Sequence, residues 1–281
     1  MEAIDLVSRL PMDAQGRRGV VHLAAGDYQV QGQLRIAAGG VVLRGAGATI
    51  TATGHDRRTL IVVRGEPVPS TSRDTRAVLG DVEAGALEVR LESVKGLSAG
   101  QRVNVRRPST EGWIKALGMD AFVGWRPESR LNWKAGSRDI VWDRVITAVH
   151  GDRVVLDAPL TAALEAAHGG GVLETAPSTA RIAEVGVETL RLVSAHDPSR
   201  PADEDHSWTA ISLDNVEDAW VRDVAAEGFA GSMVDVGASA RRITVQDVNA
   251  GAPVSEIGGL RRRVFYTAGQ QTLFLRCASE E

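Results

Sequence analysis

The segment from residue 19 to residue 53 constrains the fold most strongly, because short β-prone pieces follow one another there with only glycine-containing corners between them. The pieces are Val20–Leu23, Tyr28–Gln31, Leu34–Ile36, Val41–Arg44 and Thr49–Thr53. No two-residue Asn-Gly or Asp-Gly turn joins them as hairpins, and no helical period separates them. Strands this short favour a chain wound as a coil, and coiled β-proteins usually present long polymers with a groove along one face.

An apolar-x-x-apolar pattern recurs in the second half of the chain at the spacing of stacked coils. The copies begin at Leu190, Val221, Val245 and Phe274, so their separations are 31, 24 and 29 residues. The two longer separations each contain an extra segment, residues 197–208 and 254–264. A coil with insertions at one corner explains this pattern, and chance similarity of Val-rich strands is the alternative.

The region between the two halves differs in its sequence pattern, because it contains hairpin signals in place of the short strands of a coil. Leu87–Val94 is predicted to pair with Gln101–Arg107, and Val141–Val149 with Arg153–Asp157. A short helix is expected over residues 109–117, because Ser109 or Thr110 can cap its start. The predicted organisation is therefore a cap and first coils in residues 1–65, an inserted β-rich subdomain in 66–180 and further coils in 181–281.

The two ends of the chain carry different signals. The first residues predict a short amphipathic helix that ends at Pro11 and covers the apolar end of the coil. They lack a basic stretch followed by an apolar core, so they are not a secretory signal peptide. The C-terminal run TLFLRCASEE shows no such cap. We therefore expect either a fragment with further coils missing or self-association at the open end.

Composition excludes several classes of function. The 281 residues are 43% hydrophobic, which permits a large core. The net charge of −4 offers no basic field for nucleic acid, so no nucleic-acid partner is expected. The sequence contains no run of 18 apolar residues, so no membrane span is predicted. The single cysteine, Cys277, excludes an intrachain disulfide and cannot alone build a structural zinc site.

Three motifs resemble the pectate-lyase-like superfamily of right-handed parallel β-helix proteins. They are VVHLAAGDY at 20–28, LRI at 34–36 and GVVLRGAG at 40–47, with Ala24 where the family often has proline. The resemblance implies an all-β fold, a right-handed single-stranded parallel β-helix with an N-terminal helical cap and an inserted β-rich subdomain. It is specific for fold and weak for reaction, because this fold serves lyases, hydrolases, epimerases and phage tailspikes.

A narrower resemblance links the chain to a group of bacterial proteins with this fold. The runs at 106–114, 203–211 and 269–277 carry it, and members of that group continue past the point where this chain stops. The resemblance implies that the parent protein is secreted or periplasmic.

The first long corner contains the acidic run Asp203, Glu204 and Asp205, followed by His206. Crowded carboxylates on a loop favour a hard cation, so these three residues are the predicted Ca²⁺ ligands. In a metal-assisted lyase the cation neutralises a uronate carboxylate, and a base then removes the acidified proton. His206 is the predicted base. The alternative is a solvated acidic loop.

The second long corner contains Glu256 and three consecutive arginines. Arginine binds carboxylates bidentately, so Arg261 and Arg262 are the predicted catalytic arginines, while Glu256 and Arg263 are predicted to bind substrate. If both corners emerge on the same side, an acidic site and an arginine cluster face each other across a groove. The alternative is that individual arginines point to water.

Tryptophans supply candidate sugar platforms. Trp113, Trp125 and Trp133, with the cation Lys115, are predicted to line one side of the groove on the inserted subdomain. Packing within that subdomain is an equal alternative. Trp208 lies beside the acidic run and is a further predicted substrate contact, whereas Trp220 falls in a strand and is expected in the core.

Aspartates in the later coils offer another chemistry. Inverting hydrolysis needs two carboxyl groups roughly 6.5–9.5 Å apart, and spacing along the chain does not establish that distance. The candidates are Asp214, Asp218, Asp223, Asp235 and Asp247.

The function predicted from the sequence is action on an acidic polysaccharide, by a lyase that cleaves through β-elimination. A glycoside hydrolase on the same fold is the first alternative. A non-catalytic glycan-binding module of the tailspike kind is the second, and an inactive fragment of an enzyme is also compatible with the sequence. The composite site fails if the two long corners lie on opposite faces of the coil.

Overall fold

The computed structural model describes residues 2–66, 74–124, 130–175, 181–259 and 261–280. The chain divides into two compact units, residues 1–68 with 179–281 and residues 69–178. The second unit therefore lies within the sequence of the first, where the sequence predicts an insert at 66–180.

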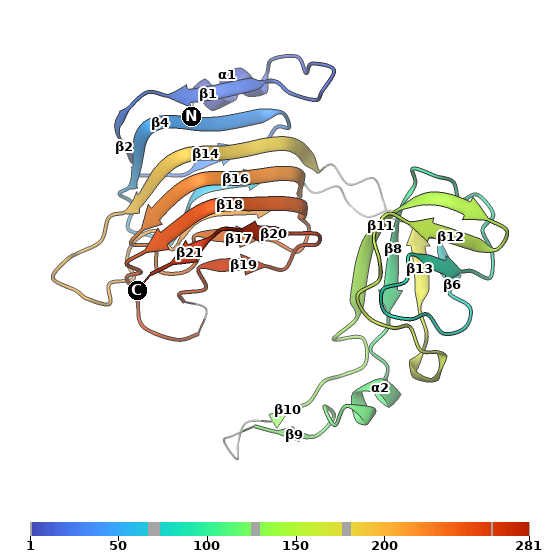
Figure 1. Cartoon of the computed structure of the whole chain (residues 1–281). Helices are drawn as coiled ribbons and strands as arrows, with labels where there is room; N and C mark the ends of the chain where they lie inside the picture. Colours follow the sequence, from blue (N-terminus) through green and yellow to red (C-terminus); the bar gives the residue numbers. More distant parts are fainter. Residues whose placement is uncertain (1, 67–73, 125–129, 176–180, 260, 281) are drawn as a thin grey trace. The chain divides into compact units, whose positions relative to one another are not determined.

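The first unit is built of parallel strands in two sheets (Figure 1). The eight-stranded sheet comprises β1 (Gly19–Leu23), β2 (Gly26–Val30), β4 (Val41–Ala52), β14 (Ile182–Ser194), β16 (Val216–Glu227), β18 (Arg241–Gly251), β20 (Leu273–Leu275) and β21 (Ala278–Ser279). The five-stranded sheet comprises β3 (Leu34–Ile36), β5 (Thr59–Arg64), β15 (Thr209–Asp214), β17 (Val234–Val236) and β19 (Phe265–Thr267).

Each turn of the chain adds strands to this stack. The coils run β1–β2–β3, β4–β5, β14–β15, β16–β17, β18–β19 and β20–β21, and within the described residues the strand pairings between neighbouring coils are parallel. The all-β class and the parallel sheets are thus confirmed. The right-handed, single-stranded winding stays a prediction.

The long strands bend at residues in the left-handed backbone region, and these residues stack in two columns. Register shows the alignment, because Val185 pairs with Ala219 and Leu190 pairs with Val224. Such a conformation is costly for residues with a Cβ atom, so its recurrence in the five coils from β4 onward marks a corner that the fold imposes. One column holds Gly40, Glu184, Asp218, Arg242 and Gln271, and the other holds Gly47, Thr189, Asp223, Asp247 and Arg276.

Inward-facing residues also stack from coil to coil, as the corner residues do. Leu43, Val187, Val221 and Val245 occupy equivalent positions in successive coils, and each is at most 1% exposed. Burying one such aliphatic side chain stabilises the fold by about 1.5–3 kcal/mol. The column therefore fixes the register, because a slip of one residue would turn each of these side chains outward.

The same register corrects one copy of the predicted repeat. Val221–Val224 aligns with residues 187–190 of the preceding coil, not with 190–193. The sequence suggested the wrong alignment because Val187, Leu190 and Val193 are all apolar, so the apolar-x-x-apolar pattern fits both 187–190 and 190–193.

The second unit is an antiparallel sheet in the order β6, β13, β8, β11, β12, β7, and a bridge between Val78 and Leu91 joins its two ends. The predicted hairpin of β11 with β12 is confirmed. The predicted pairing of 87–94 with 101–107 is wrong, because β7 pairs with β12 and β8 pairs with β11 and β13. The strands are β6 (Thr75–Ala77), β7 (Glu88–Arg90), β8 (Arg102–Arg107), β11 (Ile140–His150), β12 (Arg153–Leu156) and β13 (Val172–Thr175), with a separate pair β9 (Phe122–Val123) and β10 (Arg130–Leu131).

Helices are few and short. Helix α1 (Glu2–Ser8) places Ile4, 3% exposed, in the core of the first unit, as expected of a cap. Helix α2 (Glu111–Ala116) begins after Thr110, whose hydroxyl accepts from the Trp113 N–H, and the remaining helical turn is 3₁₀ (Ala166–His168). Among the described residues no helix is long and apolar enough to cross a membrane.

The corner columns predict the effect of removing a strained residue. Thr189 is an exposed, β-branched residue with φ of 56°, so Thr189→Gly should raise the free energy of unfolding by about 1 kcal/mol, measured by urea denaturation. Thr51→Gly, within regular strand β4, is the matched control and should lower it by a similar amount. Equal destabilisation by both substitutions would contradict the account of the corners.

Candidate functional site

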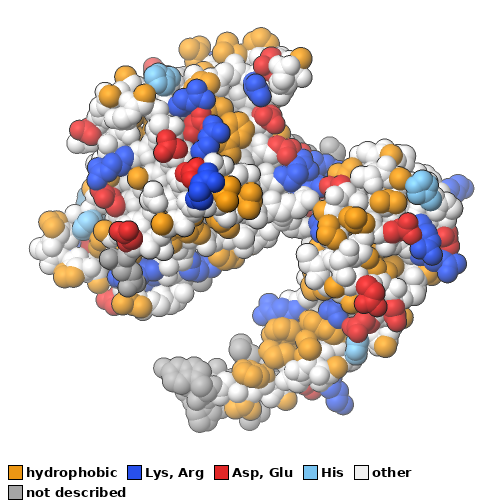
Figure 2. All heavy atoms as spheres, viewed as in Figure 1, with side chains coloured by type: hydrophobic (Ala, Val, Ile, Leu, Met, Phe, Trp, Pro, Cys, Tyr) orange, Lys and Arg blue, Asp and Glu red, His pale blue; other side chains and the backbone are white. Residues whose placement is uncertain are grey.

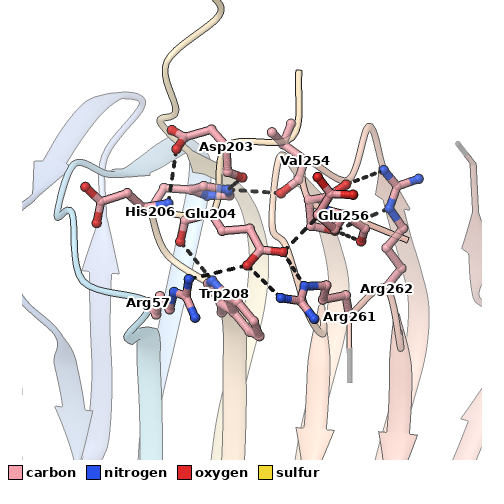
Figure 3. A network of polar contacts seen from close by, with 11 residues as sticks. Arg57, Asp203, Glu204, His206, Trp208, Val254, Glu256, Arg261 and Arg262 are labelled. Atoms are coloured by element: carbon pink, nitrogen blue, oxygen red, sulfur yellow. Dashed lines mark hydrogen bonds and ion pairs between the residues drawn. The ribbon is translucent and has the colours of Figure 1, made fainter. Parts of the chain in front are cut away.

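The two long corners of the first unit lie side by side (Figure 3). One connects β14 to β15 and the other connects β18 to β19. His206 of the first contacts the Val254 carbonyl of the second at 3.0 Å, and Glu204 forms an ion pair with Arg261. The condition set for the composite site, that both corners emerge on the same side, is thus met, but the opposite charges contact each other directly and do not face each other across a groove.

Glu204 is the centre of this corner network. Arg261 donates to both of its carboxylate oxygens, with Nη2 at 2.9 Å from Oε2, and Arg57 lies at 3.4 Å. The backbone N–H of Glu256 donates to the same carboxylate at 3.3 Å. Hydrogen bonds from Arg261 are the main reason that the pKa of Glu204 lies below its usual range. The carboxylate is therefore held ionised, and the protein itself supplies its countercharge.

Trp208 belongs to the same network. Its indole N–H donates to the Glu204 carbonyl at 3.0 Å. The guanidinium groups of Arg57 and Arg261 lie 4.9 and 5.4 Å from its ring centroid. These cation–π contacts use ring surface that a sugar would need, so this arrangement gives Trp208 a structural role. Its role as a substrate contact stays a prediction.

His206 is fully buried and engaged at both ring nitrogens. Nδ1 lies 2.7 Å from the Ser194 hydroxyl, and Nε2 lies 3.0 Å from the carbonyls of Asp203 and Val254. Because carbonyls only accept, Nε2 must carry a proton. The ring thus ties the two corners together, and this arrangement does not support the predicted role of His206 as a base, which remains untested.

The predicted calcium ligands have separate environments. Asp203 accepts from the backbone N–H groups of Asp197 and Asp205 at 3.0 and 3.1 Å, which lowers its pKa, and it pairs with Arg200 at 2.9 Å. The Asp205 side chain is exposed. No group of three or more acidic, histidine or cysteine side chains in the described part of the chain is arranged to hold a metal. Calcium binding stays an untested prediction.

The remaining predicted residues of the second corner also diverge. Arg262 donates to the carbonyl and hydroxyl of Ser255 at 2.8 and 3.3 Å, so it braces its own loop. The Glu256 side chain is exposed. Arg263 turns away from the network and lies 4.0 Å from the Tyr266 ring centroid. Its Nε is buried and has no hydrogen-bond partner among the described residues.

A different site lies on the outer face of the five-stranded sheet. A pocket of about 630 Å³ is lined by Arg64, Ser212, Asp214, Asp235 and Ser239, with five further residues. Strand register builds it, because Arg64 pairs with Asp214 and Ser212 pairs with Asp235 across neighbouring coils. Asp214 and Asp235 therefore lie on the same face, one coil and two residues apart.

The two carboxyl groups of this pocket differ in their surroundings. Asp214 forms an ion pair with Arg64 at 3.4 Å and accepts from the Ser239 hydroxyl. Asp235 has no hydrogen bond to its carboxyl group within the described ranges. Burial raises the pKa of Asp235, and the charge of Asp214 adds to this, although the charge of Arg263 opposes it. The pKa of one carboxyl is thus raised, while its neighbour is paired with a cation.

Strand geometry sets the separation of the two Cα atoms from which the carboxyl groups project on the same face. Parallel strands lie about 4.8 Å apart and rise about 3.3 Å per residue, which places the two Cα atoms about 8 Å apart. Inverting glycosidases hold their carboxyl groups roughly 6.5–9.5 Å apart. Gly237 keeps the space beside Asp214 open, because a Cβ atom there would lie 2.7 Å from Oδ1 of Asp214.

The other candidate aspartates lie at the corners of the eight-stranded sheet. Asp218 forms two hydrogen bonds with Arg242, and Asp247 forms two with Arg276, which lowers the pKa of Asp247 to about 2. Asp223 is exposed. None of these three lines the pocket of Asp214 and Asp235.

The predicted aromatic platform lies in the second unit. Trp113 and Trp133 stack with ring centroids 6.0 Å apart, and Arg107 lies 4.5 Å from the Trp113 ring. Lys115 lines a pocket of about 560 Å³ with Trp133. Trp125 lies outside the described residues. Substrate binding by Trp113 and Lys115 stays a prediction.

The sequence reasoning missed Arg64 and Tyr266. Tyr266 pairs in register with Asp235, so it extends the outward row that contains Val62, Ser212 and Asp235. Aligning TLIVVR, TAISLD, VDV and FYT by their buried positions would have brought these outward residues onto one face.

The corner network predicts how stability depends on pH. The folded pKa of Glu204 is depressed, so its contribution is present above its unfolded pKa of about 4.3 and is lost as pH falls through the folded value. Glu204→Gln should therefore lower the Tm at pH 7, and the difference from wild type should shrink below about pH 4. Glu256→Gln, on the same loop pair, is the control and should change little. A Tm difference that is independent of pH would contradict this role of the Glu204 charge.

Comparisons with known proteins bear on the fold alone. No family model and no curated protein matches the chain. The tailspike protein gp49 from Pseudomonas phage LKA1 is similar in structure, with a TM-score of 0.51 and 18% identity over 85% of this chain and 34% of that chain. This likeness is to a β-helix fold, and the resemblance to the pectate-lyase-like superfamily is not confirmed.

Two more distant structures are also tailspikes. The gp54 tailspike of Acinetobacter baumannii bacteriophage AP22, in complex with capsular saccharide, has a TM-score of 0.39 and 9% identity over 98% of this chain and 50% of that one. The Pseudomonas phage phi297 tailspike gp61 has a TM-score of 0.37 and 11% identity over 93% and 39%. The chain thus spans half or less of the tailspike chains that it matches.

Proposed function

We propose that the outer face of the five-stranded sheet hydrolyses a polysaccharide, with Asp235 as general acid and Asp214 as general base. The observation that carries this proposal is one pocket holding two carboxyl groups, of which burial keeps one inclined to stay protonated and an arginine pairs with the other. The likeness in fold to a phage tailspike supports a glycan-binding or glycan-degrading module.

The chemistry is a single displacement. Asp235 donates its proton to the glycosidic oxygen as the bond from that oxygen to the anomeric carbon breaks. Asp214 takes a proton from a water molecule whose oxygen forms the new bond to the anomeric carbon on the opposite face. Arg64 and the Ser239 hydroxyl hold the Asp214 carboxylate in place for this step. The products are an alcohol end and a reducing end of inverted configuration.

The surroundings favour an acidic substrate. Arg263 is a cation whose buried Nε has no hydrogen-bond partner in the described part of the chain, and it lies over Tyr266, which is next to Asp235 in register. A sugar carboxylate could pair with such a guanidinium, and the exposed part of Tyr266 offers ring surface. A polymer of uronates therefore fits this face better than a neutral glucan.

The lyase predicted from the sequence is the alternative reaction. Its base and its carboxylate-binding arginine, His206 and Arg261, are engaged within the corner network, so hydrolysis is the better supported reaction. A module that binds glycan without cleaving it is the other alternative, and neither aspartate would then matter for the length of the polymer.

The proposal predicts the loss of cleavage on removing either carboxyl group. Asp235→Asn and Asp214→Asn should each lower the release of reducing ends from polygalacturonate, alginate or hyaluronan by a factor on the order of 10²–10⁴. Asp223→Asn is the matched control, because it is an exposed aspartate in the same stack and asparagine tolerates its left-handed backbone.

The same assay separates the alternatives. Ultraviolet absorbance of an unsaturated uronate would mark β-elimination and contradict hydrolysis. Cleavage that survives in Asp235→Asn would contradict the assignment of the acid. Polymer that is bound but never shortened by wild type would favour the binding module.

A further inference from the structure

The outer face of the eight-stranded sheet carries a second pocket, which shares no residue with that of Asp214 and Asp235. Its volume is about 660 Å³, within the range of small-molecule sites. Figure 2 shows this face of the first unit, where Lys/Arg and Asp/Glu side chains alternate beside hydrophobic ones. The lining includes Arg17, Arg18, Val20, Val42, Arg44 and Trp220.

Trp220 lies flat on the surface of this sheet. Its neighbours Ala219 and Val221 are buried, whereas Trp220 points outward and is half-buried, so the expectation that it lies in the core is wrong. Gly186 is its register partner on β14, and a Cβ atom at Gly186 would fall within 2.6 Å of three indole atoms. The indole therefore rests on bare backbone, and its other face is turned away from the sheet.

A buried carboxylate fixes the orientation of this ring. The indole N–H donates to Oε2 of Glu188 at 2.8 Å. Glu188 is 2% exposed, and it also accepts from Arg44 and Arg222, its register partners in the two neighbouring coils. One carboxylate is thus shared by two arginines. Arg44, Glu188 and Arg222 together therefore carry a net positive charge beside the Trp220 ring.

The N-terminal segment adds net positive charge to the same pocket, because Arg17 and Arg18 outnumber Asp13, which also lines it and whose carboxylate accepts from the Arg17 backbone N–H at 2.8 Å. Arg18 donates to the carbonyls of Leu10 and Gly39, and these neutral acceptors do not cancel its charge. Arg17 is exposed, and none of the described residues makes an ion pair or hydrogen bond with its guanidinium group. The pocket therefore combines an oriented aromatic face, the apolar side chains of Val20 and Val42, and the Arg17 guanidinium, which no other described residue pairs with.

We propose that this pocket binds an acidic sugar residue, with the pyranose ring stacked on Trp220 and its carboxylate paired with Arg17. An apolar sugar face matches the indole and the valines, and the carboxylate matches the excess positive charge. A neutral sugar would leave the arginines unused, and a small inorganic anion would leave the aromatic face unused. The site is non-catalytic and lies on a different sheet from the aspartate pair, so it would hold an acidic polymer at a second point along the stack.

The test uses monosaccharides, which cannot be cleaved, so its outcome does not depend on the proposed hydrolysis. Glucuronate, glucose and acetate are titrated separately while the six indole N–H signals are followed by NMR, with Trp220→Phe identifying the Trp220 signal. We expect glucuronate to shift the Trp220 signal saturably at millimolar concentration, and to bind at least several-fold more tightly than glucose or acetate. Trp208, covered by two arginines, is the internal control and should not shift.

Two variants test the charge. Arg17→Gln should weaken glucuronate binding roughly tenfold, whereas Arg9→Gln, an exposed arginine on the N-terminal segment outside the pocket lining, should leave it unchanged. An unshifted Trp220 signal would overturn the proposal. Equal affinity for glucuronate and glucose, equal affinity for glucuronate and acetate, or equal effects of the two arginine substitutions would also overturn it.

Discussion

The parallel register between coils is the constraint on which the rest of this structure depends. Inward columns of aliphatic side chains and outward corners in the left-handed backbone region hold each coil in phase with the next. Every outward residue therefore faces its counterpart one coil away, whatever their separation along the chain. Arg64 and Asp214 are neighbours for this reason, although the whole inserted unit lies between them in the sequence.

Much of the coil could be predicted from the sequence, because short strands and glycine corners are local signals. The repeat also located the two long corners, although whether they emerge on the same side was left open as a condition of the composite site. The role of these corners could not be predicted from the sequence, because opposite charges at adjacent corners can bind either a ligand or each other. Glu204 and Arg261 bind each other, and both ring nitrogens of His206 are engaged by two carbonyls and a hydroxyl. Loop composition cannot distinguish these outcomes, because they depend on distances of one or two ångströms.

The two outer faces were harder to predict, because each depends on register between coils. Asp235 differs from the other aspartates only in its neighbours, which leave its carboxyl half-buried and beside another acid. Trp220 was assigned to the core because strands bury large apolar residues, yet it lies outward over Gly186. A glycine within a strand is the signal that was overlooked, since it marks a place where something approaches the backbone closely.

The central claim is that stacking places Asp214 and Asp235 in one pocket, where burial raises the pKa of Asp235 above its usual range. The most direct test is a pH titration of the aspartate carboxyl carbons by ¹³C NMR, in wild type and in Asp214→Asn. The account predicts that the pKa of Asp235 lies above the ordinary value of about 3.9 and falls when the charge of Asp214 is removed. A pKa for Asp235 at or below 3.9, unchanged in Asp214→Asn, would contradict it.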